Sequence, residues 1–124
     1  MILIIGGAYQ GKKALARQKY GLTENDIYTC TGSEIDLNYP CIDSLEKFSY
    51  CCVLEDKDPI ACLDQHLPLL QDKILICRDI FSGVVPVDKN LRIWRETTGR
   101  MCQFLAANAE SVIRVFCGLE QVLK

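Results

Sequence analysis

The sequence predicts an α/β fold, a single domain over residues 1–124 in which helices pack on a mostly parallel sheet of about five strands. Short apolar runs alternate along the chain with segments whose apolar residues recur every three or four positions, the order expected of strand–helix–strand units. The first run, Met1–Ile5, is apolar at every position, which is typical of a strand covered on both faces. With 124 residues, 49% of them hydrophobic, the chain can bury one core.

The N-terminal third is expected to hold two strands and one helix. After the strand Met1–Ile5 the chain passes two glycines, and a helix is expected from Gly11 to Tyr20. Gly21 closes this helix, because glycine readily adopts the left-handed conformation that follows a helix C terminus. A second short strand is expected over Asp26–Thr31, and the polar segment 32–40 is expected to be irregular.

In the middle of the chain, Asp43–Phe48 is expected to form a turn of helix and Tyr50–Leu54 (YCCVL) the third strand. Asp58 and Pro59 begin the next helix, because Asp caps a helix N terminus and Pro fits its first turn. Pro68 is expected to bend or shorten the end of this helix. Its apolar face is formed by Ile60, Leu63, Leu67 and Leu70.

The C-terminal part is expected to hold the fourth strand, Lys73–Cys77, and the longest helix, from Asp88 to about Ala109. A fifth strand is expected over Val112–Cys117, and Glu120–Leu123 is expected to form a short strand at the edge of the sheet. The apolar residues near one face of the longest helix are Leu91, Trp94, Met101 and Leu105.

The segment between the first strand and the first helix, GGAYQGKK, has the G-x-x-x-x-G-K spacing of a phosphate-binding loop. Glycines let the backbone wrap an anion with its N–H groups pointing inward, and the helix N terminus adds positive potential. The sequence therefore predicts a P-loop-type three-layer fold. The residues expected to bind phosphate are Gly6, Gly7, Ala8, Tyr9, Gln10, Gly11, Lys12 and Lys13.

The expected ligand is a nucleoside triphosphate, with Lys12 as a catalytic residue that reaches the outer phosphates. No base-recognition motif separates ATP from GTP. Two alternatives stay open, which are a glycine-rich turn without a ligand and an anion site without nucleotide specificity.

Lys13 stands where the motif requires Ser or Thr. That hydroxyl coordinates Mg²⁺ beside the phosphates, whereas an ammonium group repels a metal ion and can contact phosphate as a second cation. We therefore expect nucleotide affinity to depend little on Mg²⁺.

An acid that coordinates the metal ion should follow a buried strand. Asp79, after Lys73–Cys77, is favoured as this catalytic, metal-side acid, and the pair Glu55-Asp56, after YCCVL, is the alternative.

Composition limits the partners. The formal charge of −2 provides no basic stripe, so nucleic-acid binding is not expected. We find no secretory leader and no apolar run long enough to span a bilayer, so no membrane partner is expected. The eight cysteines lie mostly in apolar runs without C-x-x-C spacing, which indicates free thiols in a reducing cytoplasm. A zinc site is the alternative, and the single histidine disfavours it.

From Arg78 the sequence runs RDIFSGVVPVDKNLRIWRETTGR. Together with the loop, this segment resembles the adenosylcobinamide kinase / adenosylcobinamide-phosphate guanylyltransferase family of cobalamin biosynthesis. That family has a loop like GGARSGKS and, later, NEVGxGIVP followed by a helix with a WRE-like start and a GR-x-x-Q-x-x-A run. The matching positions are Gly6-Gly7-Ala8, Gly11-Lys12, Asp79-Ile80, Gly83-Val84-Val85-Pro86, Trp94-Arg95-Glu96, Gly99-Arg100, Gln103 and Leu105-Ala106-Ala107.

The resemblance implies a P-loop α/β fold and a homo-oligomer, usually a trimer. It implies two transferase activities, namely phosphorylation of a hydroxyl of the corrinoid cobinamide and guanylyl transfer through a histidine. Arg100 is expected to contact phosphate, because it lies within the matched GR-x-x-Q run. The function indicated is a nucleotide-binding protein with residual kinase-type transfer in corrinoid metabolism. The alternative is a non-catalytic, oligomeric binding or regulatory protein that keeps the fold.

Several positions depart from the family pattern. Lys13 replaces the hydroxyl residue, Asp79 replaces Glu, and Arg78 replaces Asn. Phe81 replaces Gly and is expected to place its ring beside the site. The family segment with the guanylylated histidine has no counterpart, and His66 lies in no similar context, so covalent guanylyl transfer is expected to be lost.

Overall fold

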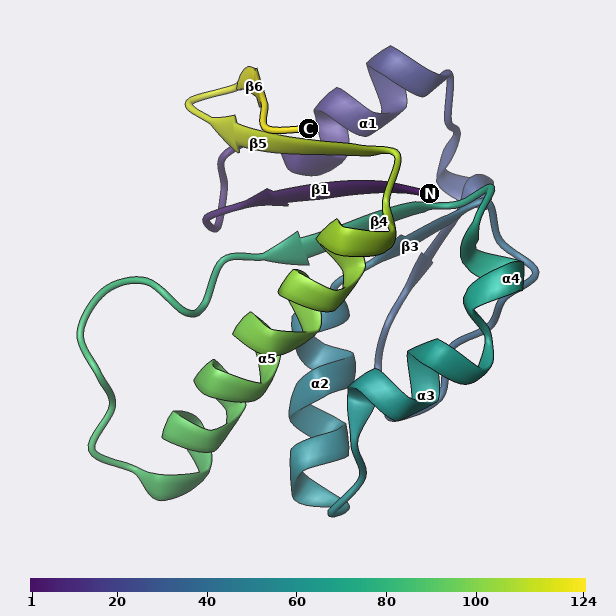
Figure 1. The fold of residues 1–124 in the computed structure, drawn as a ribbon. Helices are drawn as coiled ribbons and strands as arrows, with labels where there is room; N and C mark the ends of the chain where they lie inside the picture. The colour runs from purple at the N-terminus through teal and green to yellow at the C-terminus, as the bar shows by residue number, and fades with distance from the viewer.

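The computed structural model describes residues 1–124 and shows one six-stranded sheet with helices on both faces (Figure 1). The strands are β1 (Ile2–Gly6), β2 (Ile27–Thr29), β3 (Cys41–Asp43), β4 (Ile74–Arg78), β5 (Ser111–Phe116) and β6 (Leu119–Val122). The helices are α1 (Lys12–Tyr20), α2 (Leu45–Leu54), α3 (Pro59–Gln65), α4 (Leu67–Leu70) and α5 (Lys89–Asn108). A single 3-10 turn covers Glu24–Asp26. The α/β class expected from the sequence is confirmed.

The strands lie in the order β2-β3-β4-β1-β5-β6. All neighbouring pairs are parallel except β5 and β6, which form an antiparallel hairpin at the edge. β1 therefore lies between β4 and β5, with Gly6 paired to Arg78. Because the parallel strands run in the same direction, the segments that follow β1, β3 and β4 meet at the same end of the sheet, beyond the carboxyl ends of these strands.

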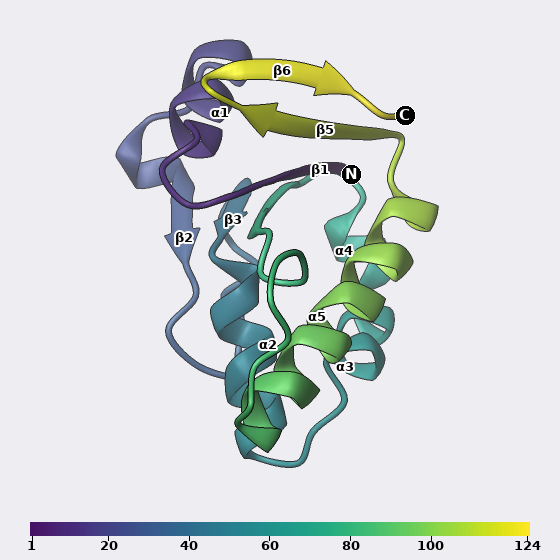
Figure 2. The same cartoon turned by 90° about the vertical axis from the view of Figure 1, so that its left-hand side faces the viewer.

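Apolar side chains alternate between the two faces of the central strands. Ile4 and Ile76 belong to a cluster beneath α1, which includes Ala16. Leu3 and Cys77 belong to a larger cluster on the opposite face, which α2 to α5 cover (Figure 2). Both faces of the sheet are thus buried, as the fully apolar runs predicted.

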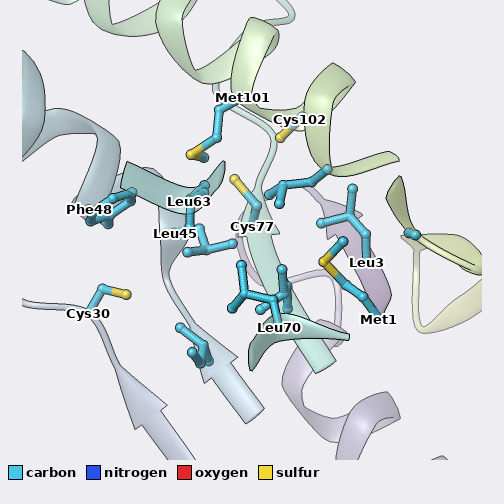
Figure 3. Packing of buried hydrophobic residues seen from close by; sticks show 14 of the residues in the cluster. Met1, Leu3, Cys30, Leu45, Phe48, Leu63, Leu70, Cys77, Met101 and Cys102 are labelled. Atoms are coloured by element: carbon cyan, nitrogen blue, oxygen red, sulfur yellow. The ribbon is translucent and has the colours of Figure 1, made fainter. Parts of the chain in front are cut away.

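The larger cluster joins helices that are far apart in sequence. Met101 and Cys102 of α5, together with Leu45 of α2, gather around Cys77 (Figure 3). All eight cysteines are free thiols, and five of them are buried: Cys30, Cys41, Cys52, Cys77 and Cys102. The expectation that most cysteines pack as small apolar side chains is confirmed.

The prediction of a strand at Tyr50–Leu54 is wrong, because this segment forms the second half of α2. Leu45, Phe48 and Cys52 are buried at spacings of three and four, so the apolar run belongs to a helical face. Leu54 is 56% exposed, which a central strand would not allow. The third strand lies earlier, at Cys41–Asp43.

The other elements lie close to their predicted positions. Asp58 caps α3, and its carboxylate accepts a hydrogen bond from Ile60 N at 3.0 Å. The expected helix is interrupted at His66, which ends α3 and precedes α4, two residues before Pro68. Asp88 caps α5 through Leu91 N at 3.0 Å. None of the helices combines the length and apolar character that crossing a membrane requires.

Candidate functional site

A cavity of about 400 Å³ opens beyond the carboxyl ends of β1, β3 and β4. The loop after β1 and the first turn of α1 form one side of it, including Lys12 and Lys13. The junction between β3 and α2 forms the other side, and Arg78 contributes from the end of β4. The predicted loop thus borders a real hollow, at the edge where α/β proteins bind ligands.

The loop carries backbone donors that have no partner within the chain. None of the N–H groups from Ala8 to Lys13 donates a hydrogen bond within the chain. Gly11 has a φ of 95° and Tyr9 a φ of 60°, so the backbone curls through the left-handed region on both sides of Gln10. A curl of successive unpaired N–H groups that leads into a helix N terminus is a geometry that binds anions.

The β5–β6 hairpin holds the loop in place. Gln10 accepts two hydrogen bonds from the turn of the hairpin. Cys117 N donates to its side-chain oxygen at 2.7 Å, and Gly118 N donates to its backbone carbonyl at 2.9 Å. Gly6 packs so closely on β5 that a Cβ would lie 2.5 Å from the Val115 carbonyl oxygen. The loop therefore rests on strands from the opposite end of the sequence.

Lys12 is half-buried in the loop, and its Nζ donates to the Gly7 carbonyl at 2.7 Å. Burial lowers the pKa of Lys12 below its usual value, while the carboxylates of Glu46 and Asp43 act in the opposite direction. The ammonium group thus folds back onto the loop and bonds its backbone.

Lys13 forms an ion pair with Asp43, with 3.8 Å between Nζ and Oδ2. The Asp43 carboxylate also accepts a hydrogen bond from Ser44 N at 2.8 Å, through Oδ1. Asp43 is the last residue of β3, so the third strand, rather than the fourth, supplies the acid that faces the loop.

Glu46 is the second acid of the cavity and is only 6% exposed. Its Oε1 accepts a hydrogen bond from Arg78 N at 2.9 Å, which ties α2 to the end of β4. The cavity is lined by four basic residues and two acidic ones: Lys12, Lys13, Lys47 and Arg78, with Asp43 and Glu46. This excess of positive charge favours an anionic ligand.

The sequence reasoning missed Asp43 and Glu46. Asp43 follows the apolar residues Cys41 and Ile42, which is the signal of an acid at a strand end. The sequence pattern favours Asp79 as the strand-end acid, with Glu55-Asp56 as the alternative, because KILIC and YCCVL are typical of strands and the shorter run before Asp43 is not. In the structure Glu55 and Asp56 follow a helix and do not line the cavity.

Asp79 does not face the cavity, in contrast to its predicted place as the metal-side acid. Its carboxylate accepts hydrogen bonds from Phe81 N at 3.2 Å and from Ser82 N at 3.1 Å. The Ser82 hydroxyl donates a third at 2.9 Å. Its backbone, by contrast, contacts the end of β1, where Asp79 N donates to the Gly6 carbonyl at 2.8 Å. The carboxylate therefore closes the turn after β4.

Phe81 also differs from expectation. Its ring packs against the larger apolar cluster and lies beside Gly99 of α5, so it does not obstruct the phosphate loop. Arg95 fastens this turn to α5, donating from Nε to the Phe81 carbonyl at 3.0 Å and from Nη2 to the Gly83 carbonyl at 2.9 Å.

Arg100 is not brought to the loop. It is exposed on α5, pairs with Glu96 at 2.5 Å, and lines a separate hollow of about 840 Å³ between α5 and the segment after β4. His66 is exposed at the break between α3 and α4 and lines neither hollow. The cavity at the loop thus contains neither of these residues.

A protein-family model described as cobinamide kinase / cobinamide phosphate guanyltransferase matches residues 57–123. The match covers more than half of the 124 residues and runs from the turn after α2 through β6. It includes the turn after β4 and all of α5, and it begins after the phosphate loop and Asp43. No curated protein sequence matches the chain.

Proposed function

The chain belongs to the cobinamide kinase / cobinamide phosphate guanyltransferase family, and from this premise we propose that it binds ATP or GTP through the loop Gly6–Lys13. We propose further that it keeps kinase-type phosphoryl transfer to a corrinoid. The family places the chain in cobalamin biosynthesis as a kinase or guanyltransferase type of protein. Nucleotide binding, the acceptor and the remaining activity are parts of the proposal.

One observation carries the proposal: the backbone N–H groups of six consecutive residues, Ala8 to Lys13, have no partner in the chain, and all of these residues except Gln10 line a cavity with an excess of basic side chains. None of these residues is buried from solvent, and phosphate oxygens can replace water with several acceptors within a small volume. Lys12 lines the cavity and bonds the loop backbone at Gly7, so its ammonium group would contact the outer phosphates and stabilise the charge that develops during phosphoryl transfer.

We propose that the guanylyltransferase half of the family's activity is absent. A covalent histidine intermediate needs a histidine beside the bound nucleotide. The single histidine of the chain, His66, is exposed between α3 and α4 and does not line the loop cavity.

The second candidate is a non-catalytic oligomer that binds nucleotide. Two observations favour it: Lys13 occupies the position of the hydroxyl residue, and the carboxylate of Asp79 is engaged by its own turn rather than directed at the cavity.

Calorimetric titration of ATP, GTP and pyrophosphate tests the binding. Lys12→Ala should weaken binding about tenfold to one hundredfold, because a hydrogen bond to a charged group is worth about 1.5–3 kcal/mol. Lys19→Ala is the matched control, since Lys19 lies on the same helix, is exposed and pairs with Glu120 at 2.7 Å. Absence of binding at millimolar ligand, or equal affinity of Lys12→Ala, would contradict the proposal.

Incubation with ATP and cobinamide, followed by mass analysis of the corrinoid, separates the two candidates. Phosphorylated cobinamide supports the kinase. Nucleotide binding without a phosphorylated product supports the non-catalytic protein.

A further inference from the structure

We propose that the ammonium group of Lys13 replaces the divalent cation of a phosphate-binding loop, so that the cavity takes a nucleoside triphosphate free of metal. This inference rests on the proposed function, because it concerns the same loop. It adds which form of the nucleotide the site selects.

The residues around the loop do not fit Mg²⁺. This ion requires near-octahedral oxygen ligands at about 2.0–2.1 Å, and the hydroxyl that usually provides one of them is replaced by Lys13. The chain contains no cluster of three or more His, Cys, Asp or Glu side chains arranged to hold a metal ion. Glu46, the buried acid of the cavity, already accepts a hydrogen bond from Arg78 N at 2.9 Å.

The remaining acid, Asp43, is paired with a cation of the chain itself. Lys13 Nζ lies 3.8 Å from Asp43 Oδ2, so a positive charge is held between the strand-end carboxylate and the loop. In a loop of the usual kind, the metal ion is held between a strand-end carboxylate and the hydroxyl residue. A cation entering this space would meet the repulsion of Lys13 and of Lys12.

The position of Lys13 also allows it to serve a ligand. Its side chain is 39% exposed, against 15% for that of Asp43, so the ammonium group lies at the surface of the cavity. An ammonium carries three donors. The 3.8 Å contact with Asp43 is an ion pair longer than a hydrogen bond, so these donors are available to phosphate oxygens.

The charge of the cavity suits a metal-free triphosphate, which keeps the negative charges that Mg²⁺ would neutralise. Lys47 and Arg78 line the same cavity as the two loop lysines. Asp43 and Glu46 offset two of these four cations, and the remaining excess of positive charge favours a ligand that carries its full negative charge.

The backbone supports this arrangement at the acid as well as at the loop. Ser44, directly after Asp43, has a φ of 64°, and Tyr9 across the cavity has a φ of 60°. Non-glycine residues in this region cost of order 1–3 kcal/mol and persist where the surrounding structure fixes them. Ser44 N donates to Asp43 Oδ1 in this conformation, which holds the carboxylate beside Lys13.

The experiment is a titration of ATP in buffer with EDTA and in buffer with excess Mg²⁺, for the parent chain, Lys13→Ser and Lys13→Arg. The parent should bind as tightly in EDTA as in Mg²⁺, or more tightly. Lys13→Ser should lose at least about tenfold in EDTA and recover affinity when Mg²⁺ is added, because it restores the hydroxyl ligand. Lys13→Arg keeps the charge and should behave as the parent does. Thermal unfolding of each variant confirms that the fold is retained.

The outcomes distinguish this inference from the function on which it rests. Binding by the parent in Mg²⁺ but not in EDTA would overturn the metal replacement and leave nucleotide binding intact. Metal-independent binding that Lys13→Ser does not change would also overturn it, because another group would then supply the charge. No binding in either buffer would overturn both proposals.

Discussion

Gly6 illustrates how a single residue sets the position of the phosphate loop. A Cβ at this residue would lie 2.5 Å from the Val115 carbonyl oxygen, a distance shorter than van der Waals contact allows. The obstacle is a backbone atom of a central strand, which cannot rotate away as a side chain could. Glycine is therefore required here for close packing of the loop on β5.

Gly6→Ala should destabilise the chain by about 1–3 kcal/mol, the usual cost of forcing extra volume into a packed site. It should also weaken nucleotide binding, because the loop must shift away from β5. Urea unfolding and the ATP titration measure the two effects. Gly32→Ala is the control, since nothing lies within 4 Å of a Cβ at that position. Equal stability of the two variants would show that β5 yields at this point.

At this scale the sequence predicts local features and misses those that depend on distant residues. Lys12 and the free N–H groups follow from the spacing of one short segment, and the structure has them at a cavity. Asp43 and Glu46 are more than thirty residues away from Lys12 and reach it only because β3 ends at the same edge. Asp79 also follows a strand, but its carboxylate turns back on Ser82, and no spacing rule shows that direction.

At the scale of elements, α2 and α5 are joined by a small polar contact inside an apolar layer. The Ser49 and Thr98 hydroxyls are fully buried and lie 2.7 Å apart. Trp94 Nε1 donates to the Glu46 carbonyl at 2.8 Å and to Ser49 Oγ at 3.1 Å. Because Glu46 also lines the loop cavity, this contact links the helix pair to the site.

Ser49→Ala should cost about 1–3 kcal/mol, because it leaves the buried Thr98 hydroxyl without its partner. Thr98→Val should cost less, since Ser49 still donates to the Glu46 carbonyl at 2.9 Å. The loss of unfolding free energy in the double variant should be about 1 kcal/mol smaller than the sum of the losses in the two single variants. Trp94 is the only tryptophan, so its fluorescence follows unfolding directly. Strictly additive costs would show that the two hydroxyls do not interact.

Element prediction succeeded where the pattern was long or capped and failed where it was short. Asp88 and a sustained helical period identified α5, and the fully apolar runs identified β1 and β4. The five residues of YCCVL fit a strand or a buried helical turn equally well, because a short apolar run does not reveal its period. β3 has three residues and follows a proline, so it offered too little pattern to be recognised.

At the scale of the whole molecule, several large apolar side chains remain exposed to solvent. Val84 and Val87, in the segment after β4, are 95% and 92% exposed. Leu119 and Val122 of the edge hairpin are also largely exposed. Large exposed apolar areas are typical of interaction surfaces, which supports the proposal, first drawn from the family resemblance, that copies of this chain associate.

We expect the chain to be a homo-oligomer in solution, with a trimer as the state implied by the family. Size exclusion with light scattering measures the mass, which is 14.0 kDa for one chain. Val84→Glu should shift the assembly toward the monomer, because it places a charge in an apolar contact. Leu69→Glu is the control, since Leu69 is a 57% exposed apolar residue of α4, outside the segment after β4 and the edge hairpin. A parent chain that stays monomeric at high micromolar concentration would contradict the proposal.

The central position of β1 in the sheet determines when this strand can pair during folding. This first strand pairs with residues 74–78 and 111–116, and the loop behind it is held by Cys117 and Gly118. During synthesis the apolar strand emerges long before its neighbours, as an unpaired strand that is prone to aggregation. The phosphate loop is therefore made before the strands that hold it, and it is fixed in shape only after they are in place. A ligand that binds only the finished loop favours complete chains over partly folded ones.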